Sequence, residues 1–376
     1  MRYIWNNNNW TNFRWHDNEI VKAISKTRFS QGKLFGLLNH LNFDEINKAH
    51  ANIIVEEAIK TAEIEGCILN KDSVRSSVAR HLGLSTAGLP EPDRHTDGLV
   101  QVLIDVTQRY DRILDIEMIK GWQAALFPTG YSGLYRIAVG KWRGKEPMQI
   151  VSGPIGREKV HFEAPPHDRV EKEMENFIKW WNNDSGTLDG LLRAGIAHLR
   201  FVTIHPFEDG NGRIARALTD MALAQDEKQS VRFYSFSSQI MAQRKFYYNV
   251  LEKTQKGDGD ITEWLLWFLN CLENAISSSD ILIEKIFAKS VFWQKFGNMN
   301  LSDRQRKVIN RLLDAGNDGF EGGLTTRKYV SMTKSSRATA YREISDLVNK
   351  GILKENQGKG RNVNYKISIS AYSNNK

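Results

Sequence analysis

The order of apolar and polar residues predicts a mainly helical chain. Apolar residues recur at helical spacing in several stretches of the first 300 residues, and the first of these stretches has acidic residues near its start and no proline. The expected helical stretches are residues 44–69, with more helix to about 110, and then 167–182, 188–202, 213–225 and 281–293.

One segment of this region has β character instead. Short β-prone runs around Ile150 and over residues 160–162 lie on either side of a turn that contains two glycines and a proline. This pattern predicts a β-hairpin. The turn consists of Ser152, Gly153, Pro154, Ile155 and Gly156.

The last segment, from Leu301 onward, has a pattern of its own. It predicts three short helices, of which the third ends at Gly351, and then two β-prone runs around a glycine-flanked turn. Thr325 or Thr326 is expected near the start of the second helix, and Ser335 or Ser336 is the expected N-cap of the third. The order of elements resembles a winged helix-turn-helix. That resemblance implies a recognition helix carrying Arg337, Thr339, Ala340, Tyr341 and Arg342, and a wing tip carrying Lys359 and Arg361.

The net charge of the chain is concentrated in this last segment. The whole sequence has 52 Lys and Arg against 44 Asp and Glu, a formal net charge of +8. From Leu301 to the end there are 15 basic and 7 acidic residues, so the first 300 residues carry 37 of each. This asymmetry favours an acidic partner such as DNA. A winged helix that serves dimerisation or protein recognition is the alternative.

Composition places the chain among soluble globular proteins of two or three domains. Hydrophobic residues make up 41% and charged residues 26% of the sequence. It contains no run of eighteen apolar residues, and the N-terminus lacks the apolar core of a secretory signal. Cys67 and Cys271 are too few for a disulfide framework or a cysteine-rich metal site. We therefore expect a reduced, cytoplasmic protein with two structural thiols and no membrane contact.

The stretch HPFEDGNGRIARAL, residues 205–218, contains a candidate phosphate site. Residues 210–212 tolerate positive φ, so the backbone there can turn its N–H groups inward around an anion. A helix expected to start near Arg213 adds its positive N-terminal end. Arg213 and Arg216 lie three apart, close to one another on the first turn. Together these groups predict a site for a polyphosphate.

Two further side chains of the stretch suit a phosphoryl-transfer reaction. Asp209 is placed to hold a hard divalent cation such as Mg²⁺. His205, at the other end of the turn, can accept a proton from an attacking hydroxyl near neutral pH. Such chemistry consists mostly of positioning and charge stabilisation, and this turn supplies both. A surface loop in which Asp and Arg simply pair is the alternative.

The twelve residues HPFEDGNGRIAR match the signature HPFx(D/E)GNGRxxR at every defining position, and on them the chain is identified as a member of the Fic family. Members transfer AMP from ATP to hydroxyl side chains. The resemblance implies that His205 is the general base, that Asp209 binds Mg²⁺, and that the turn holds the α- and β-phosphates while Arg216 reaches the γ-phosphate. The implied nucleotide-binding residues are Gly210, Asn211, Gly212, Arg213, Ile214, Ala215 and Arg216, with Phe207 as a buried anchor of the loop.

Two other segments resemble parts of the same family. The predicted hairpin stands where the family has its flap, a strand edge that aligns the target peptide by backbone pairing. Residues 244–269 resemble the helix that closes the nucleotide pocket. Because Tyr247 and Tyr248 are adjacent, only one of them can face the pocket. We expect this to be Tyr248, with a position in the core as the alternative.

Residues 61–66, TAEIEG, fit the pattern (S/T)xxxE(G/N) of an inhibitory helix in many Fic proteins. Thr61 and Glu65 are four apart, so they share one helix face, and Gly66 completes the pattern. The resemblance implies that Glu65 pairs with Arg216, occupies the position of the γ-phosphate and prevents productive ATP binding. Glu65 could also orient a water that removes AMP from a modified protein, as in some relatives. A solvated helix face is the alternative.

These features predict a mainly α fold with four parts. The N-terminal aromatic segment, YIWNNNNWTNFRW at residues 3–15, reads as ordered and resembles the opening of a domain commonly fused ahead of Fic cores. The predicted parts are a helical N-terminal domain with the inhibitory helix (1–115), a Fic core with the hairpin flap (116–280), a linking helix (281–300) and a winged helix-turn-helix (301–370).

The resemblance implies an adenylyltransferase that uses ATP and Mg²⁺. Its acceptors would be Ser, Thr or Tyr hydroxyls of target proteins and of the chain itself, and a homodimer is the implied assembly. Two alternatives stay open. One is a DNA-binding regulator whose Fic core senses nucleotide, and the other is a Fic core that transfers a different phosphate-linked group.

Overall fold

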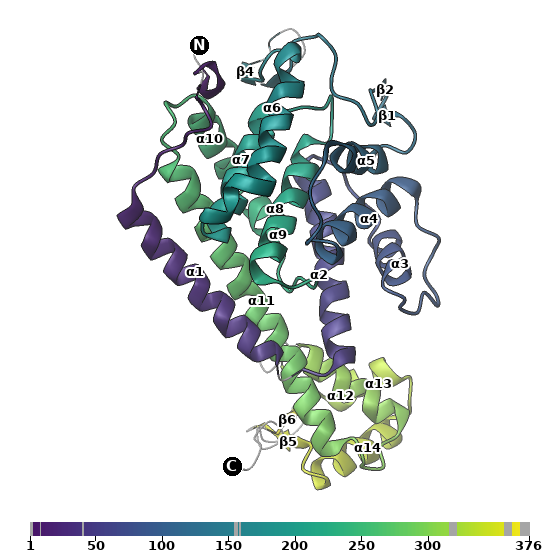
Figure 1. Ribbon diagram of the computed structural model, residues 1–376. Helices are drawn as coiled ribbons and strands as arrows, with labels where there is room; N and C mark the ends of the chain where they lie inside the picture. Colours follow the sequence, from purple (N-terminus) through teal and green to yellow (C-terminus); the bar gives the residue numbers. More distant parts are fainter. Residues whose placement is uncertain are drawn as a thin grey trace. The chain divides into compact units, whose positions relative to one another are not determined.

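The computed structural model describes residues 3–7, 9–39, 41–153, 157, 159–315, 322–356 and 363–368. Helices dominate these residues and the strands are short (Figure 1). A mainly helical fold was predicted from the sequence, and this prediction is confirmed.

The chain divides into two compact units. The first comprises Met1–Lys33 and His50–Ser279, and the second comprises Leu34–Ala49 and Asp280–Lys376. The first helices of the chain are α1 (Asp17–Leu38), α2 (Phe43–Ile64), α3 (Lys71–His81), α4 (Arg94–Gln108) and α5 (Ile116–Leu126). After four short strands come α6 (His167–Lys179), a π-helical turn (Trp180–Asp184), a 3-10 turn (Ser185–Thr187), α7 (Gly190–Ile204), α8 (Asn211–Glu227), α9 (Phe236–Ala242), α10 (Arg244–Gln255) and α11 (Thr262–Phe296).

Helices α7 and α8 form the centre of the first unit and pack closely against each other. Nearly every residue of α7 is buried, which explains why its sequence is apolar almost throughout instead of along one stripe. Asp189 caps α7 by accepting a 2.9 Å hydrogen bond from the N–H of Leu191. Helix α4 packs against α3, α5 and α8. The N-terminal helices α3 and α4 therefore belong to the same unit as α7 and α8, and the limits of the two units do not fall at residue 115.

The N-terminal segment is anchored by its aromatic residues, as predicted. Trp5 and Trp10 are buried. The indole N–H of Trp5 donates to the carbonyl of Glu163 at 2.7 Å, and that of Trp10 donates to Glu173 at 3.1 Å. A 3-10 turn (Ile4–Asn6) lies between Tyr3 and the following loop. Helix α1, which follows this segment, was not predicted.

Two of the three small antiparallel sheets lie between α5 and α6. Strands β1 (Tyr131–Ser132) and β2 (Tyr135–Arg136) form one. Strands β3 (Gln149–Ser152) and β4 (Lys159–Glu163) form the predicted hairpin, with a register irregularity between Ile150 and Val151. The turn residues Pro154, Ile155 and Gly156 lie outside the described residues.

The predicted linking helix is not a separate element. Helix α11 runs without interruption over 35 residues, so residues 281–293 are its second half and the expected boundary at residue 280 falls inside it. The polar residues 277–280, SSSD, interrupt the apolar pattern there, but the sequence has no glycine or proline that would end the helix.

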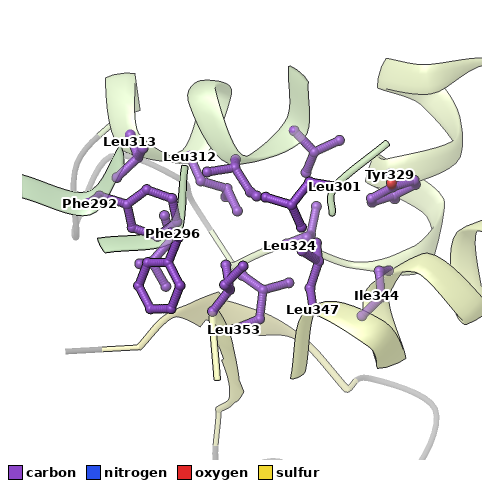
Figure 2. Close-up of a cluster of buried hydrophobic side chains, with 14 of the residues drawn as sticks. Phe292, Phe296, Leu301, Leu312, Leu313, Leu324, Tyr329, Ile344, Leu347 and Leu353 are labelled. Atoms are coloured by element: carbon purple, nitrogen blue, oxygen red, sulfur yellow. The ribbon is translucent and has the colours of Figure 1, made fainter. Parts of the chain in front are cut away.

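The second unit contains three short helices and a hairpin. These are α12 (Asp303–Ala315), α13 (Thr326–Thr333), α14 (Arg337–Asn349), β5 (Leu353–Glu355) and β6 (Tyr365–Ile367). Thr325 and Ser336 are the N-caps of α13 and α14, and Gly351 adopts a left-handed φ of 71° after α14, as predicted. Figure 2 shows the buried cluster that joins these elements, formed by residues such as Phe292, Leu324, Leu347 and Leu353.

Two composition-based predictions have different outcomes. Cys271 is buried, but Cys67 is exposed, so the prediction that both cysteines are structural is wrong for Cys67. In the described part of the chain, no helix is both long enough and apolar enough to cross a bilayer.

Candidate active site

His205 occupies the end of α7 in a conformation that few residues adopt. It is the C-cap of the helix, with a left-handed φ of 50°, and its backbone N–H still donates to the carbonyl of Phe201 at 3.0 Å. The imidazole Nδ1 lies 3.2 Å from the carbonyl of Val202. Because a carbonyl only accepts, Nδ1 carries the proton in the neutral ring and Nε2 has a free lone pair. Among the described residues, Nε2 has no hydrogen-bond partner.

The surroundings keep this imidazole neutral. Burial lowers the pKa of His205 to about 4, and the Arg143 guanidinium acts in the same direction. The Val202 carbonyl and the carboxylates of Glu65 and Asp209 oppose the shift. At neutral pH the ring is therefore an unprotonated base of fixed tautomer.

Asn211 fixes the loop that follows His205. Its side chain accepts from the N–H of Phe207 at 2.9 Å and donates to the carbonyl of the same residue at 2.8 Å. The Phe207 ring is fully buried and packs against Trp142, with ring centroids 4.9 Å apart. The resemblance implied this anchor. The Asn211 side chain thus braces the loop from within.

The turn itself differs from the predicted one. Of residues 210–212, Gly210 alone has a positive φ, at 92°, and α8 starts at Asn211 instead of near Arg213. A Cβ at Gly210 would lie 3.0 Å from the ring of Phe127, so the position also requires the absence of a side chain. The first N–H groups of α8, which have no partner within the helix, therefore begin directly after this glycine.

Residues outside the signature hold the loop from the other side, and the sequence analysis missed them. Arg143 is buried and donates through Nε to the carbonyl of His205 at 2.8 Å, while its backbone N–H donates to the carbonyl of Pro206 at 2.9 Å. The N–H of Ala138 donates to Glu208 at 2.9 Å. These residues lie in an irregular segment without periodicity, so no sequence signal identified them.

Asp209 and Arg213 lie on the outer side of the loop. The Asp209 carboxylate is partly exposed, accepts from the Ser132 hydroxyl at 2.5 Å and lies 3.7 Å from the Arg213 guanidinium. Arg213 itself packs over the ring of Phe127, 4.8 Å from the centroid. In the described residues no three His, Cys, Asp or Glu side chains come together as a metal cluster. Any cation here would have Asp209 as its protein carboxylate.

The following residues of α8 divide between core and site. Ile214 and Ala215 are completely buried, so their side chains face the core and not the loop. Arg216 is also buried, but its guanidinium points back to the start of the helix. A Cβ at Gly212 would lie 3.2 Å from NH1 of Arg216, and this NH1 has no hydrogen-bond partner among the described residues. A buried unpaired donor thus faces the first turn of α8.

The end of α2 meets Arg216 at three atoms. Nε of Arg216 donates to the Thr61 hydroxyl at 2.6 Å, and NH2 donates to the Thr61 carbonyl at 3.0 Å and to Oε1 of Glu65 at 2.7 Å. The Arg216 side chain is 1% exposed and that of Glu65 is 29% exposed. Oε1 would lie 2.1 Å from a Cβ at Gly212, so a glycine there is what allows the carboxylate to approach α8.

Thr61 and Glu65 were expected to share one face of a helix, but Glu65 lies just after the helix. Helix α2 ends at Ile64, and Gly66 adopts a left-handed φ of 82°. The N–H of Gly66 donates to the carbonyl of Glu63, and that of Cys67 donates to the carbonyl of Ala62, both at 3.0 Å. This is a Schellman ending, in which Gly66 is the residue that must be left-handed. The glycine of the TAEIEG stretch therefore ends the helix so that Glu65 projects from its last turn.

Comparison with known proteins identifies the family of this arrangement. The sequence profile of the Fic/DOC family matches residues 113–223, which include the whole loop and most of α8. The chain is a Fic-domain protein. A second profile, a domain of unknown function named DUF4172, matches residues 3–84, which contain α1 and α2.

Curated relatives of this Fic-domain protein match part of it. A probable protein adenylyltransferase from Aquifex aeolicus is 30% identical over 142 residues, which are 35% of this chain and 44% of that protein. A protein adenylyltransferase Fic from Drosophila sechellia is 33% identical over 132 residues, which are 34% of this chain and 25% of that protein. The matched regions therefore span less than half the length of these relatives.

A solved structure shares the fold over nearly the whole chain. The crystal structure of a Fic family protein from Desulfovibrio desulfuricans G20 has a TM-score of 0.52 and 19% sequence identity, and the match covers 93% of this chain and 96% of that one. The mainly helical architecture is therefore that of known Fic proteins.

Of the two adjacent tyrosines in the Fic-domain protein, Tyr247 belongs to the core and Tyr248 does not. Tyr247 is buried, and its hydroxyl is 2.9 Å from Nε2 of His198. Tyr248 is 37% exposed, and its hydroxyl donates a long 3.4 Å bond to the carbonyl of Ile64, next to Glu65. Burial and then the nearby Glu65 charge raise the pKa of Tyr248. Tyr248 is thus the tyrosine of this pair that lies beside the end of α2.

The β3–β4 hairpin, which the sequence analysis predicted to be a flap, is tied to α10. Ser152 lies 2.6 Å from Nε2 of His161, and Nδ1 of His161 lies 2.6 Å from the carboxylate of Glu252. Gly153 follows with a positive φ of 103°. These contacts fix the two strands next to the helix that also carries Tyr248.

The candidate nucleic-acid contacts lie in the second unit. Arg337, Tyr341 and Arg342 are exposed on α14, whereas Thr339 is partly buried and pairs with Ser336 at the helix start. Ala340 is buried in the core. Lys359 and Arg361 lie outside the described residues.

Proposed function

We propose that this Fic-domain protein is a protein adenylyltransferase that transfers AMP from ATP to hydroxyl side chains of target proteins and of itself, and that Glu65 holds it in an inhibited state. One observation carries the proposal. The loop that fixes a neutral His205 leads directly into the start of α8. Among the described residues, neither Nε2 of His205 nor the buried NH1 of Arg216 has a hydrogen-bond partner. A base, a positive helix end and an unpaired cationic donor are thus contiguous.

In the proposed reaction the hydroxyl oxygen of the acceptor attacks the α-phosphorus of ATP. A new oxygen–phosphorus bond forms while the bond from the α-phosphorus to the bridging oxygen breaks, and pyrophosphate leaves. Nε2 of His205 takes the hydroxyl proton, because Nδ1 already donates to the Val202 carbonyl. The N–H groups at the start of α8 and the Arg216 guanidinium stabilise the phosphate charge.

The residues present fit a Mg²⁺ ion bound together with the nucleotide. Asp209 offers one partly exposed carboxylate, and Mg²⁺ in such sites takes one or two carboxylates together with phosphate oxygens and water. Bound there, the ion would neutralise charge on the leaving pyrophosphate. The Ser132 hydroxyl holds one oxygen of Asp209 in place for this role.

The inhibited state follows from where the Glu65 carboxylate lies. It already provides the start of α8 with a negative charge and pairs with a donor of Arg216 at 2.7 Å. A phosphate of ATP would need the same donors and would meet a like charge. Hydrogen bonds to charged groups contribute about 1.5–3 kcal/mol, so removal of Glu65 should raise the rate of AMP transfer roughly 10- to 100-fold.

The test measures labelling of Glu65→Gly and of wild-type protein in the presence of Mg²⁺. Each protein is incubated with ATP labelled at either the α- or the γ-phosphate. We expect label from the α-position alone, together with intact mass increases of whole AMP units, and faster labelling in Glu65→Gly. Glu65→Ala and Glu63→Ala form a matched pair, since Glu63 lies in the last turn of α2, two residues before Glu65, and pairs with Lys60.

Three outcomes would contradict the proposal. Label from the γ-position alone would indicate transfer of a different phosphate-linked group. Equal rates for wild type and Glu65→Gly would remove the inhibitory role of Glu65. Absence of label from Glu65→Gly with every tested protein, despite bound ATP, would favour removal of AMP or nucleotide sensing.

A second candidate function rests on the second unit. We propose that its three helices and hairpin are a winged helix that binds DNA through α14, in a regulator whose Fic domain senses nucleotide. The exposed Arg337 and Arg342 and the positive charge of residues 301–376 support this candidate. We expect the protein to be retained on a DNA column at physiological salt. The double variant Arg337→Ala/Arg342→Ala should lose this retention, and His205→Ala should keep it. Absence of retention even at low salt would contradict it.

A further inference from the structure

Helix α2 carries a second carboxylate that the proposed reaction does not use. Glu57 lies eight residues before Glu65, slightly more than two helical turns. It is buried, with 6% of its surface exposed. A buried carboxylate is costly unless hydrogen bonds compensate it, so its partners indicate what it is for.

Three donors from one short segment surround Glu57. The Ser235 hydroxyl donates to it at 2.7 Å, the backbone N–H of Ser237 donates at 3.1 Å, and the Ser237 hydroxyl donates to the other carboxylate oxygen. Ser235 is the N-cap of α9, and Ser237 lies in the first turn of that helix. Ser237 is fully buried. These residues are 178 to 180 positions from Glu57, so only the tertiary fold brings them together.

Ionisable side chains of α8 and of the segment after it lie near Glu57. Arg232 lies 3.5 Å from Asp220 and 3.2 Å from Glu227. Burial raises the pKa of Asp220 to about 8, and the charge of Glu57 adds to the shift. Both effects favour the protonated form of Asp220.

Two of the contacts that hold α2 thus involve buried groups of the polypeptide that follows the catalytic loop. One is Arg216 with Glu65 at the end of the helix, and the other is the serine pair with Glu57 about two turns earlier. A helix fixed at one point keeps a side chain two turns away in a narrow range of positions. Preorganisation of this kind strengthens a contact by lowering the entropy lost in forming it.

We propose that Glu57 is a positioning residue for the inhibitory contact, and that its hydrogen bonds to Ser235 and Ser237 set how effectively Glu65 competes with nucleotide for Arg216. This inference rests on the proposed function for its effect on catalysis. Its structural part, the restraint of α2, is independent of that function.

Glu57→Gln in the full chain tests the proposal. The amide keeps the shape of the side chain but presents an N–H₂ group where the serine donors need an acceptor. We expect self-modification several-fold faster than in wild type, because loss of one such bond changes an equilibrium about 5- to 10-fold. In the Glu65→Gly background the same change should have no effect, since Glu57 acts only through Glu65.

The matched control is Glu56→Gln. Glu56 precedes Glu57 on α2 but is exposed, and it accepts a single bond, from the Ser238 hydroxyl at 2.6 Å. We expect the control to remain within twofold of wild type. Ser237→Ala is the second variant in case Glu57→Gln does not fold, since it removes one donor and leaves the carboxylate in place.

Amide hydrogen exchange of residues 57–67 separates the two parts of the inference. Faster exchange of these residues in Glu57→Gln or Ser237→Ala than in Glu56→Gln would support the restraint of α2 by Glu57. This holds even if no variant transfers AMP, because that outcome would contradict only the proposed function. Exchange equal to that of Glu56→Gln would overturn the restraint of α2 by Glu57. Faster exchange without faster AMP transfer, in a chain that Glu65→Gly activates, would overturn its role in inhibition. An equal rise in the Glu65→Gly background would do so as well.

Discussion

The loop after α7 and the end of α2 are two polar sites built in opposite ways. In the loop, Asn211 binds the backbone of Phe207 four residues away, and His205 binds the carbonyl of Val202 three residues away. At the end of α2, Thr61 and Glu65 bind an arginine more than 150 positions distant. The candidate chemistry is therefore assembled largely from within one stretch of sequence, and the candidate control depends on the packing of distant helices.

This difference predicts which changes affect each site. A side chain of the loop can be removed without disturbing α2, and the contacts of α2 can be weakened without disturbing the loop. Substitutions in the loop should therefore reduce catalysis or stability, whereas substitutions at the contacts of α2 should increase activity. The following four experiments test this separation, in order of decreasing effect.

The largest expected effect is that of His205→Ala in the Glu65→Gly background. Loss of a general base lowers the rate of such reactions about 10²- to 10⁴-fold, so we expect AMP transfer to fall by this factor. The measurement is the initial rate of labelling from α-labelled ATP. His16→Ala, a change at an exposed histidine, is the control and should leave the rate unchanged. Activity of His205→Ala within tenfold of its parent would contradict the assigned role.

Asn211→Ala should destabilise the protein. It leaves the N–H and the carbonyl of the buried Phe207 without partners, which we expect to lower the free energy of unfolding by about 2–3 kcal/mol. Urea denaturation followed by circular dichroism measures the change. Asn176→Ala, at an exposed position of α6, should change it by less than about 0.5 kcal/mol. Equal effects of the two substitutions would show that the bracing is unimportant.

Thr61→Ala should release part of the inhibition. The Thr61 hydroxyl accepts from Nε of Arg216, and a single such bond changes the balance between inhibited and free Arg216 about threefold to tenfold. We expect faster AMP transfer than in wild type, yet slower than in Glu65→Gly. Thr61→Ser keeps the hydroxyl and should behave as wild type. A rate in Thr61→Ala below that of wild type would place Thr61 with the groups that support catalysis.

The smallest expected effect concerns pH. Because the pKa of His205 is lowered to about 4, its base form is already complete at pH 6, and protonation should lower the rate only below about pH 5. Titration of His205 should therefore change the labelling rate of Glu65→Gly little between pH 6 and pH 8. Circular dichroism at each pH controls for unfolding. A tenfold loss per pH unit starting near pH 7 would show that the histidine titrates in its ordinary range.

Some errors of the sequence analysis have local physical causes. The segments around Ala138 and Arg143 hold the loop after α7, but they have neither periodicity nor a recognisable motif. The prediction placed a separate helix at residues 281–293, whereas these residues are the second half of the continuous helix α11. Gly66 was assigned to an inhibitory helix, whereas the structure shows that it ends that helix.

The sequence by itself determined the features that depend on near neighbours. The mainly helical fold, the caps Thr325 and Ser336, and the compact group of residues from His205 to Arg216 follow from propensities, capping and a motif that are all local. Only the tertiary structure decided which groups meet across the chain. The lowered pKa of His205, the three contacts of Arg216 and the burial of Glu57 between serines all depend on helices packed from distant parts of the sequence. Burial and long-range pairing set these properties, and neither is encoded in the spacing of residues along one segment.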